Sequence, residues 1–142
     1  MDNAKRFAGI FDGLRCAYGT YRIDRTNQNG KNTGKAQVIK SPRTDDLWEG
    51  HLSGEGDAIG IIPINEDNNC KWGCIDVDTY PLDLTKLIQD IRRLKLPLVV
   101  CRSKSGGAHC FLFTTDWVSA KDMQETLQTV AAGLGYGTSE IF

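Results

Sequence analysis

The stretch Lys71-Trp72-Gly73-Cys74-Ile75-Asp76-Val77-Asp78-Thr79-Tyr80 has the pattern of a short β-strand. Successive side chains on a strand point to opposite faces, so Asp76 and Asp78 share one face and their apolar neighbours share the other. Two adjacent carboxylates repel each other unless a cation lies between them, and Mg²⁺ or Mn²⁺ suits oxygen ligands. Asp-x-Asp alone fits two unrelated acids at a solvated strand end equally well. The spacing therefore leaves both interpretations open.

The second half of the chain alternates between strand and helix patterns. Apolar residues at helical spacing predict a helix over residues 84–94, with Asp83 as its N-cap. A second helix is expected to begin at Ser119, beside Asp122, and to end in the glycine-rich residues 133–135. The four strands are predicted over residues 73–78, 98–102, 108–113 and 138–142.

This βαββαβ order is that of the ferredoxin-like fold, which RNA-recognition motifs also use. Its sheet order is 4-1-3-2, with the first strand between the third and the fourth. That topology would bring the end of the first strand, at Asp78, beside His109, and would bring Glu140 near Asp76. We therefore expect an α+β fold: a ferredoxin/RRM-like βαββαβ core over residues 71–142 with an N-terminal α/β extension, residues 1–70, packed on it.

The extension is less regular. A helix is predicted over residues 4–14, strands over 18–22 and 36–39 around a turn at Asn29-Gly30, and a buried strand over 58–64. Its basic residues lie scattered among polar ones: Arg22, Arg25, Lys31, Lys35, Lys40 and Arg43. They would suit a surface that contacts phosphates, and an ordinary solvated loop would account for them equally well.

Composition sets the outer limits. The 142 residues carry a formal net charge of −1, which argues neither for nor against a nucleic-acid partner. No apolar run reaches the ~18 residues that span a bilayer, and the N-terminus lacks a signal-peptide core, so we expect a cytoplasmic protein without a membrane partner. The five cysteines indicate a reducing compartment. Cys70 and Cys74 lack the second pair that structural zinc requires, and buried thiols are expected.

A second motif, Arg102-Ser103-Lys104-Ser105-Gly106-Gly107-Ala108-His109, joins the second and third predicted strands. Its glycines permit positive φ and let an anion approach the backbone. Its hydroxyls and positive groups suit the triphosphate of a nucleotide whose metal ion lies on Asp76 and Asp78. A tight hairpin with solvated side chains is the alternative.

Together these two stretches resemble motifs I and II of the archaeo-eukaryotic primase superfamily, an Asp-x-Asp strand and a Ser-x-His-type hairpin. A longer set resembles the primase-polymerase branch of phages, plasmids and TOTE conflict systems: Trp48, His51-Leu52-x-Gly54, Gly60-Ile61-Ile62-Pro63, Trp72, Asp76-x-Asp78-x-Tyr80, the Ser-Gly-Gly-Ala-His turn and Glu140-Ile141-Phe142. His51 has no metal-ligand spacing, and we interpret it as structural.

The resemblance implies template-directed nucleotidyl transfer from (d)NTPs onto DNA or RNA primers, with or without de novo primer synthesis. Asp76, Asp78 and Glu140 would bind two Mg²⁺ or Mn²⁺ ions, one of which activates the attacking 3′-hydroxyl. The family often has Asp where this chain has Glu140. Ser105 and His109 would hold the triphosphate. The rest of the hairpin would assist: Arg102, Ser103, Lys104, Gly106 and Gly107.

The same resemblance implies single-stranded DNA template and nucleoside triphosphates as partners, with helicase or other replication modules in a longer protein of a bacterial, archaeal or phage-infected cell. Two other classes stay open. A metal-dependent nuclease could use the same three carboxylates. A non-catalytic, RRM-like nucleic-acid-binding module would need exposed aromatic side chains on the central strands, where the first strand instead presents acids.

Overall fold

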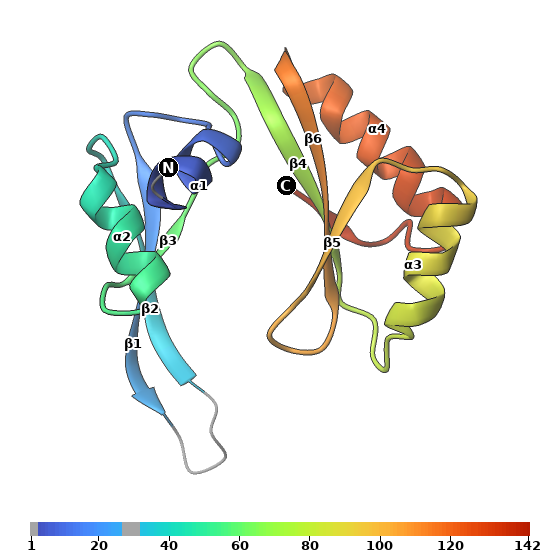
Figure 1. The fold of residues 1–142 in the computed structure, drawn as a ribbon, viewed down its shortest axis with the longest axis horizontal. Helices are drawn as coiled ribbons and strands as arrows, with labels where there is room; N and C mark the ends of the chain where they lie inside the picture. Colours follow the sequence, from blue (N-terminus) through green and yellow to red (C-terminus); the bar gives the residue numbers. More distant parts are fainter. Residues whose placement is uncertain (1–2, 27–31) are drawn as a thin grey trace. The chain divides into compact units, whose positions relative to one another are not determined.

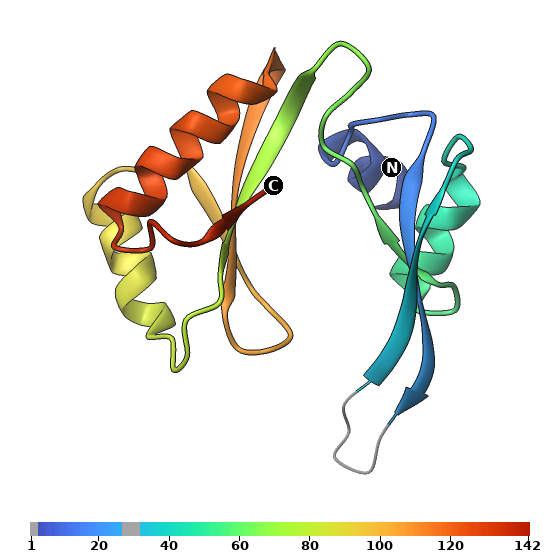
Figure 2. The same ribbon diagram turned by 180° about the vertical axis from the view of Figure 1, so that it is seen from behind.

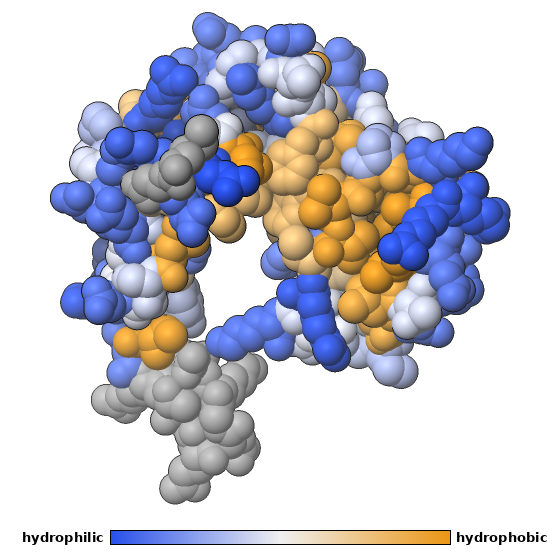
Figure 3. All heavy atoms as spheres, viewed as in Figure 1, coloured by the Kyte–Doolittle hydropathy of each residue, from blue (hydrophilic) through white to orange (hydrophobic). Residues whose placement is uncertain are grey.

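The computed structural model describes residues 3–26 and 32–142. The chain divides into two compact units, Met1–Asp67 and Asn68–Phe142, each with its own antiparallel sheet (Figure 1, Figure 2). Apolar side chains reach the surface of both units (Figure 3). Val38 in the first unit and Val99 in the second are more than half exposed. Within the described ranges, no helix has the length and apolar content that crossing a bilayer requires.

The second unit has the predicted βαββαβ order. Its elements are β4 (Asn69–Val77), α3 (Leu84–Arg93), β5 (Leu98–Arg102), β6 (Ala108–Ser119), α4 (Ala120–Gly133) and β7 (Glu140–Ile141). The sheet order is β5-β6-β4-β7, and β4 pairs antiparallel with both β6 and β7. This is the predicted 4-1-3-2 order, so the α+β, ferredoxin-like fold class is confirmed.

Both helices of this unit lie on one side of its sheet (Figure 1, Figure 2). The core between them is a cluster of apolar side chains with Ile75 and Val77 of β4 and Leu127 of α4 almost fully buried. Gly73 lets α4 approach, because a Cβ at this position would lie 2.7 Å from Cδ1 of Leu127. Alternation along β4 therefore sends Asp76 to the face opposite the helices.

The predicted helix caps are present. Asp83 accepts a hydrogen bond from the Lys86 amide at 2.9 Å, and Ser119 accepts one from the Asp122 amide at 3.4 Å. Each side chain satisfies an amide that has no partner within its own helix. The expected bounds of β4 and β6 were wrong, because β4 runs from Asn69 to Val77 and β6 continues to Ser119.

The extra length of β4 and β6 forms one paired ladder that continues past a bulge between Cys70 and Trp72. Polar contacts stabilise it where apolar alternation is missing. The Thr114 hydroxyl lies 3.1 Å from the Lys71 carbonyl oxygen and 2.8 Å from that of Asp116. The Lys71 ammonium lies 5.4 Å from the centre of the Trp117 ring. The edge strand β7 is shorter than the predicted strand 138–142.

The first unit is a three-stranded sheet with two helices. Its elements are α1 (Asn3–Ile10), β1 (Tyr18–Thr26), β2 (Asn32–Ile39), α2 (Asp45–Ser53) and β3 (Ala58–Gly60), and the sheet order is β2-β1-β3. The β1–β2 pair confirms the two predicted strands and lengthens both. The proposed turn at Asn29-Gly30 lies outside the described residues.

Two expectations for this unit were wrong, and one helix was not predicted. The first helix ends at Ile10, because the Leu14 amide donates instead to the Ile62 carbonyl at 2.9 Å. Ile62 lies within the predicted buried strand 58–64. Only Ala58–Gly60 of that range pairs with the sheet, and these residues are exposed or half-buried. Helix α2 was not predicted. Its acidic first turn and Gly54 C-cap at φ 77° bound a helix in which Trp48 is the buried residue.

Arg43 also differs from the rest of the basic set. Its guanidinium is only 10% exposed and lies 3.4 Å from Oδ1 of Asp12, so it forms an ion pair inside the unit. Burial of the guanidinium lowers the pKa of Arg43, whereas the Asp12 carboxylate raises it. Arg43 is thus a structural residue, and Lys35 and Lys40 stay exposed.

Candidate active site

One row of residues crosses all four strands of the second sheet. Asp76 of β4 pairs with His109 of β6 on one side and with Glu140 of β7 on the other. Cys101 of β5 pairs with His109 and extends the row. The expected neighbour of Glu140 is confirmed. The expected neighbour of His109 was Asp78, and this was wrong by two residues. Val77 pairs with Ala108, and Asp78 follows the last residue of the strand.

Asp76 has an unsatisfied oxygen. Its Oδ1 is buried and accepts no hydrogen bond from any residue that the structure describes. Nε2 of His109 lies 3.4 Å from this oxygen, which permits an ion pair when the imidazole is protonated but lacks hydrogen-bond geometry. Burial raises the pKa of Asp76, the nearby charges of Asp78 and Glu140 raise it further, and His109 opposes them.

A bound cation would supply the missing contact of Asp76 Oδ1 and would oppose the rise in its pKa. It would give Oδ1 the partner that is missing and would offset the repulsion that raises the pKa of Asp76. The donor set fits a hard divalent ion such as Mg²⁺ or Mn²⁺, because it consists of carboxylate oxygens. Among the described residues, however, no group of three or more His, Cys, Asp or Glu side chains is already arranged to hold a metal. The structure thus brings Asp76, Asp78 and Glu140 to one end of the sheet without closing them into a full coordination shell.

Tyr80 connects the aspartate strand to the glycine-rich hairpin. Its hydroxyl lies 2.8 Å from Oδ1 of Asp78 and 2.7 Å from Oγ of Ser105. Because a phenol has one proton, the Tyr80 hydroxyl donates to the carboxylate while the Ser105 hydroxyl can donate to it. Oγ of Ser103 lies 3.3 Å from that of Ser105 and continues the chain. Tyr80 was not among the predicted site residues; its position two residues after Asp78 was the available signal.

The hairpin packs against the end of β4 through its backbone. The Ser103 amide donates to the Gly107 carbonyl at 3.0 Å, and Gly106 adopts φ 95°, which favours glycine. A Cβ on Gly107 would lie 2.2 Å from the carbonyl oxygen of Val77. Only glycine fits at that position. Arg102 and Lys104 are exposed on either side of Ser103 and add positive charge to the hairpin.

An aromatic row begins at His109 and continues along β6. The His109 and Phe111 rings meet edge to face with centroids 6.1 Å apart, and Phe111 stacks on Phe113 at 5.8 Å. Trp72 of β4 lies 6.1 Å from Phe111, centroid to centroid. An RRM-like module was expected to need exposed aromatic residues on the central strands, and the row on the central strand β6 was not predicted. Their alternate spacing along β6 was the signal.

The buried cysteines are confirmed as thiols of the interior. Cys70, Cys74 and Cys110 are buried, and all five cysteines are unpaired. Burial raises the pKa of Cys74 to about 12 and that of Cys110 to about 11. These thiols stay protonated at neutral pH and are poor nucleophiles and poor metal ligands.

A protein-family profile described as the TOTE conflict system, Archaeo-Eukaryotic Primase domain (AEP-TOTE) matches residues 14–137 of the chain. The matched range contains β4, the glycine-rich hairpin and β6. It ends before β7, so Glu140 lies outside it. A comparison with curated proteins found no match.

Proposed function

The chain belongs to the archaeo-eukaryotic primase domain family of TOTE conflict systems, a family of primase-like nucleotidyltransferases, and we propose that it is a primase-polymerase catalytic domain. It would transfer nucleotides from (d)NTPs onto a DNA or RNA primer along a single-stranded DNA template. The observation that carries the proposal is the hydrogen-bonded connection from Asp78 through Tyr80 to Ser105, which joins a carboxylate pair to a hairpin suited to phosphates.

In this proposal Asp76 and Asp78 hold the divalent ions. The unsatisfied Oδ1 of Asp76 supports its role as a ligand, since a buried carboxylate oxygen without a partner is costly. Mg²⁺ or Mn²⁺ bound there would supply the positive charge that an in-line phosphoryl displacement requires. Glu140 would be the third carboxylate. Its register position beside Asp76 and its contribution to the raised pKa of that residue support the assignment.

The hairpin would hold the triphosphate. Gly106 leaves room for an anion because a Cβ there would meet no atom within 4 Å, and Ser103 and Ser105 offer hydroxyl donors. Arg102 and Lys104 would add charge. His109 would lie between the carboxylates and the triphosphate. It is the second residue of β6, directly after the hairpin, and its Nε2 lies 3.4 Å from Oδ1 of Asp76. From there it could donate to a phosphate oxygen.

A titration tests this proposal. A fluorescent nucleoside triphosphate is added to the protein with and without Mn²⁺, and extension of a primer on single-stranded DNA is followed in parallel. We expect binding that depends on the metal, at least tenfold weaker binding in His109→Ala, and loss of the metal dependence in Asp76→Asn/Asp78→Asn. Asp116→Asn is the control, because it removes an exposed carboxylate elsewhere on β6.

Unchanged nucleotide binding in both site variants would contradict the assignment. Cleavage of single-stranded DNA that requires Mn²⁺, without triphosphate binding, would favour the nuclease instead, since both activities can use the same carboxylates. Binding of nucleic acid alone would favour a second candidate, the RRM-like binding module. The half-buried rings of Phe111 and Phe113 support this second candidate, because bases stack on such side chains.

A further inference from the structure

The sheet face that carries the carboxylate row also carries apolar side chains. Phe111 follows His109 by two residues on β6, so both side chains point away from the helices. Val99 of β5 is the cross-strand partner of Phe111, and Cys101 is that of His109. Directly paired residues of an antiparallel sheet share a face. Phe111 and Val99 therefore form an apolar platform two residues along the strands from the row of the candidate site.

Both side chains of the platform can be reached from solvent. Val99 is 52% exposed, and Phe111 is half-buried although it lies on a central strand. The Phe111 ring packs against those of Trp72, Phe113 and His109. A ring held by its neighbours in this way has little rotational freedom left to lose when a ligand packs on it. The platform is thus preorganised for binding.

The platform lies next to the place proposed for a triphosphate. Strand β6 begins at Ala108, directly after the hairpin, and His109 is its second residue. Phe111 is two residues further along, a distance of about 7 Å at the rise of a β-strand. In a nucleotide only the sugar separates the base from the phosphates. A nucleotide whose phosphates contact the hairpin and His109 could therefore place its base on the platform.

The chemistry of the platform suits a base. Nucleobases are flat, and their faces pack on aromatic and aliphatic side chains whichever base is present. Neither Phe111 nor Val99 has a hydrogen-bonding group in its side chain, so the two residues cannot read the pairing edge of a base. Template-directed synthesis requires such a contact, because the template rather than the protein must select the base.

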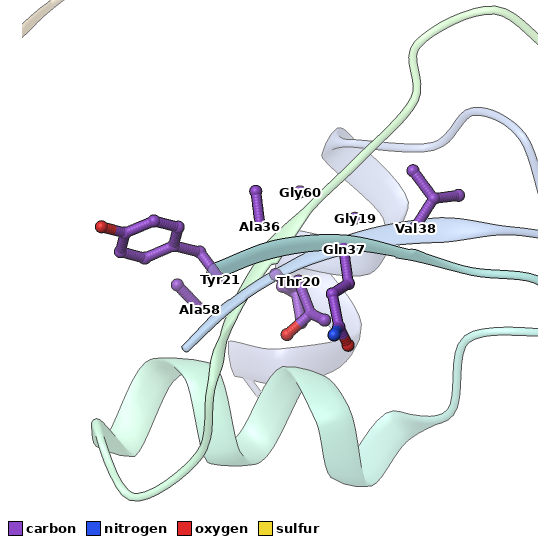
Figure 4. Close-up of a pocket in the computed structure, with 9 residues that line it drawn as sticks. Gly19, Thr20, Tyr21, Ala36, Gln37, Val38, Ala58 and Gly60 are labelled. Carbon is purple, nitrogen blue, oxygen red and sulfur yellow. The ribbon is translucent and has the colours of Figure 1, made fainter. Parts of the chain in front are cut away.

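The sheet of the first unit has an apolar face with different surroundings. Tyr21, Ala36 and Val38 lie on its side away from α2, beside a hollow of about 420 Å³ (Figure 4). Among the described residues that line this hollow, none has a charged side chain. The hollow therefore lacks groups that would hold a phosphate beside an apolar ligand. Val38 is 64% exposed and provides a matched control position for Val99.

We propose that Phe111 and Val99 bind the nucleobase of the incoming nucleoside triphosphate, whichever base it is, while the hairpin and His109 bind the phosphates. This inference rests on the proposed function and adds to it the residues that contact the base. A base of the template strand is the alternative ligand. The position two residues from His109 favours the nucleotide, because the phosphates of the nucleotide would be held there.

Isothermal titration calorimetry on the full chain with Mn²⁺ tests the proposal by comparing dATP and dCTP with inorganic tripolyphosphate, which has no nucleoside. Phe111→Leu and Val99→Thr should each weaken binding of both nucleotides by about three- to tenfold, because apolar contact with the base is lost. Tripolyphosphate binding should stay unchanged. Val99→Tyr adds a ring and should tighten nucleotide binding, a gain that a damaged fold cannot imitate. Val38→Thr is the control and should alter neither ligand.

The inference and the proposed function fail separately. A parent protein that binds no triphosphate would overturn both. Losses confined to the nucleotides, in a protein that does not extend primers, would support the base contact and contradict the polymerase.

Three results would overturn the inference alone. One is an equal loss of nucleotide and tripolyphosphate affinity in Phe111→Leu, with folding checked by circular dichroism. Another is parent-like nucleotide affinity in both Phe111→Leu and Val99→Thr. The third is weaker binding of a labelled oligothymidylate to these variants with nucleotide binding unchanged, which would assign the platform to the template strand.

Discussion

The two units of this chain differ in how they use apolar residues. Of the sixteen buried hydrophobic residues in the described ranges, twelve belong to the second unit, and ten of those form one cluster between its sheet and helices. The first unit buries four, and the face of its sheet away from α2 exposes apolar side chains. A well-packed core can offset the repulsion among acids on the other face of the second sheet. The first unit buries fewer apolar side chains and has less such stability in reserve.

The largest expected effect is on the free energy of unfolding, which should depend on how tightly each unit is packed. Leu127→Ala should lower the free energy of unfolding by about 2–5 kcal/mol, because Leu127 is fully buried in the core of the second unit. Leu52→Ala, on α2 of the first unit, should cost less than about 0.5 kcal/mol because that side chain is 40% exposed. Urea denaturation measures both. Equal costs would contradict the contrast in packing.

A second prediction compares two tyrosine hydroxyls. Tyr80→Phe removes the group that joins Asp78 to Ser105, and it should weaken metal-dependent nucleotide binding by about two- to tenfold, the usual effect of one hydrogen bond. The same change at Tyr21, a matched loss of a phenol hydroxyl in the first unit, should leave metal-dependent nucleotide binding unchanged. Ser105→Ala combined with Tyr80→Phe should cost little more than either alone. Full additivity would mean that the two hydroxyls act independently.

The smallest effect is a pH dependence of stability. The pKa of Asp76 is raised in the folded protein, so the folded state holds more protons than the unfolded chain between the unfolded and folded pKa values. The free energy of unfolding contributed by this group therefore falls as pH rises through that interval. Asp76→Asn should raise Tm by about 1–4 °C at pH 7 in EDTA, and the gain should disappear below the ordinary pKa of aspartate.

Asp57→Asn provides the matched change in the first unit, where the carboxylate is exposed, and Tm should stay constant there. A second arm adds Mn²⁺ at pH 7. Saturating metal should stabilise the parent protein but not Asp76→Asn, since a ligand that binds only the folded state raises its stability. A lower Tm for Asp76→Asn in EDTA would mean that the carboxylate stabilises the fold, contrary to its unsatisfied oxygen.

Much of the second unit could be predicted from its sequence, because local signals and topology agree there. The bounds of β5 match residue for residue, and Asp83 and Ser119 cap their helices as expected. Helix α2 escaped prediction because Trp48 is its one buried residue, too little for a periodic pattern. The end of β6 escaped because polar contacts of Thr114, rather than alternation of apolar residues, hold it in the ladder.

The candidate site was predictable in composition more than in arrangement. Topology alone brought Glu140 to Asp76, since antiparallel neighbours follow from the strand order. The partner of His109 depends on register: it is Asp76 rather than Asp78, two residues away, and strand order alone does not fix that offset. The link through Tyr80 spans 25 residues of sequence and depends on where the hairpin folds back. No local pattern encodes such a contact.

The contact between Gly107 and the Val77 carbonyl separates two tasks within the site. The hairpin meets the aspartate strand backbone to backbone, so the spacing between them does not depend on which side chains the hairpin displays. Substitutions at Ser103, Lys104 and Ser105 should therefore change affinity for the ligand without moving the hairpin away from the strand. A side chain at position 107 should instead push the two halves of the site apart. Position 107 thus sets the distance, and its neighbours set the affinity.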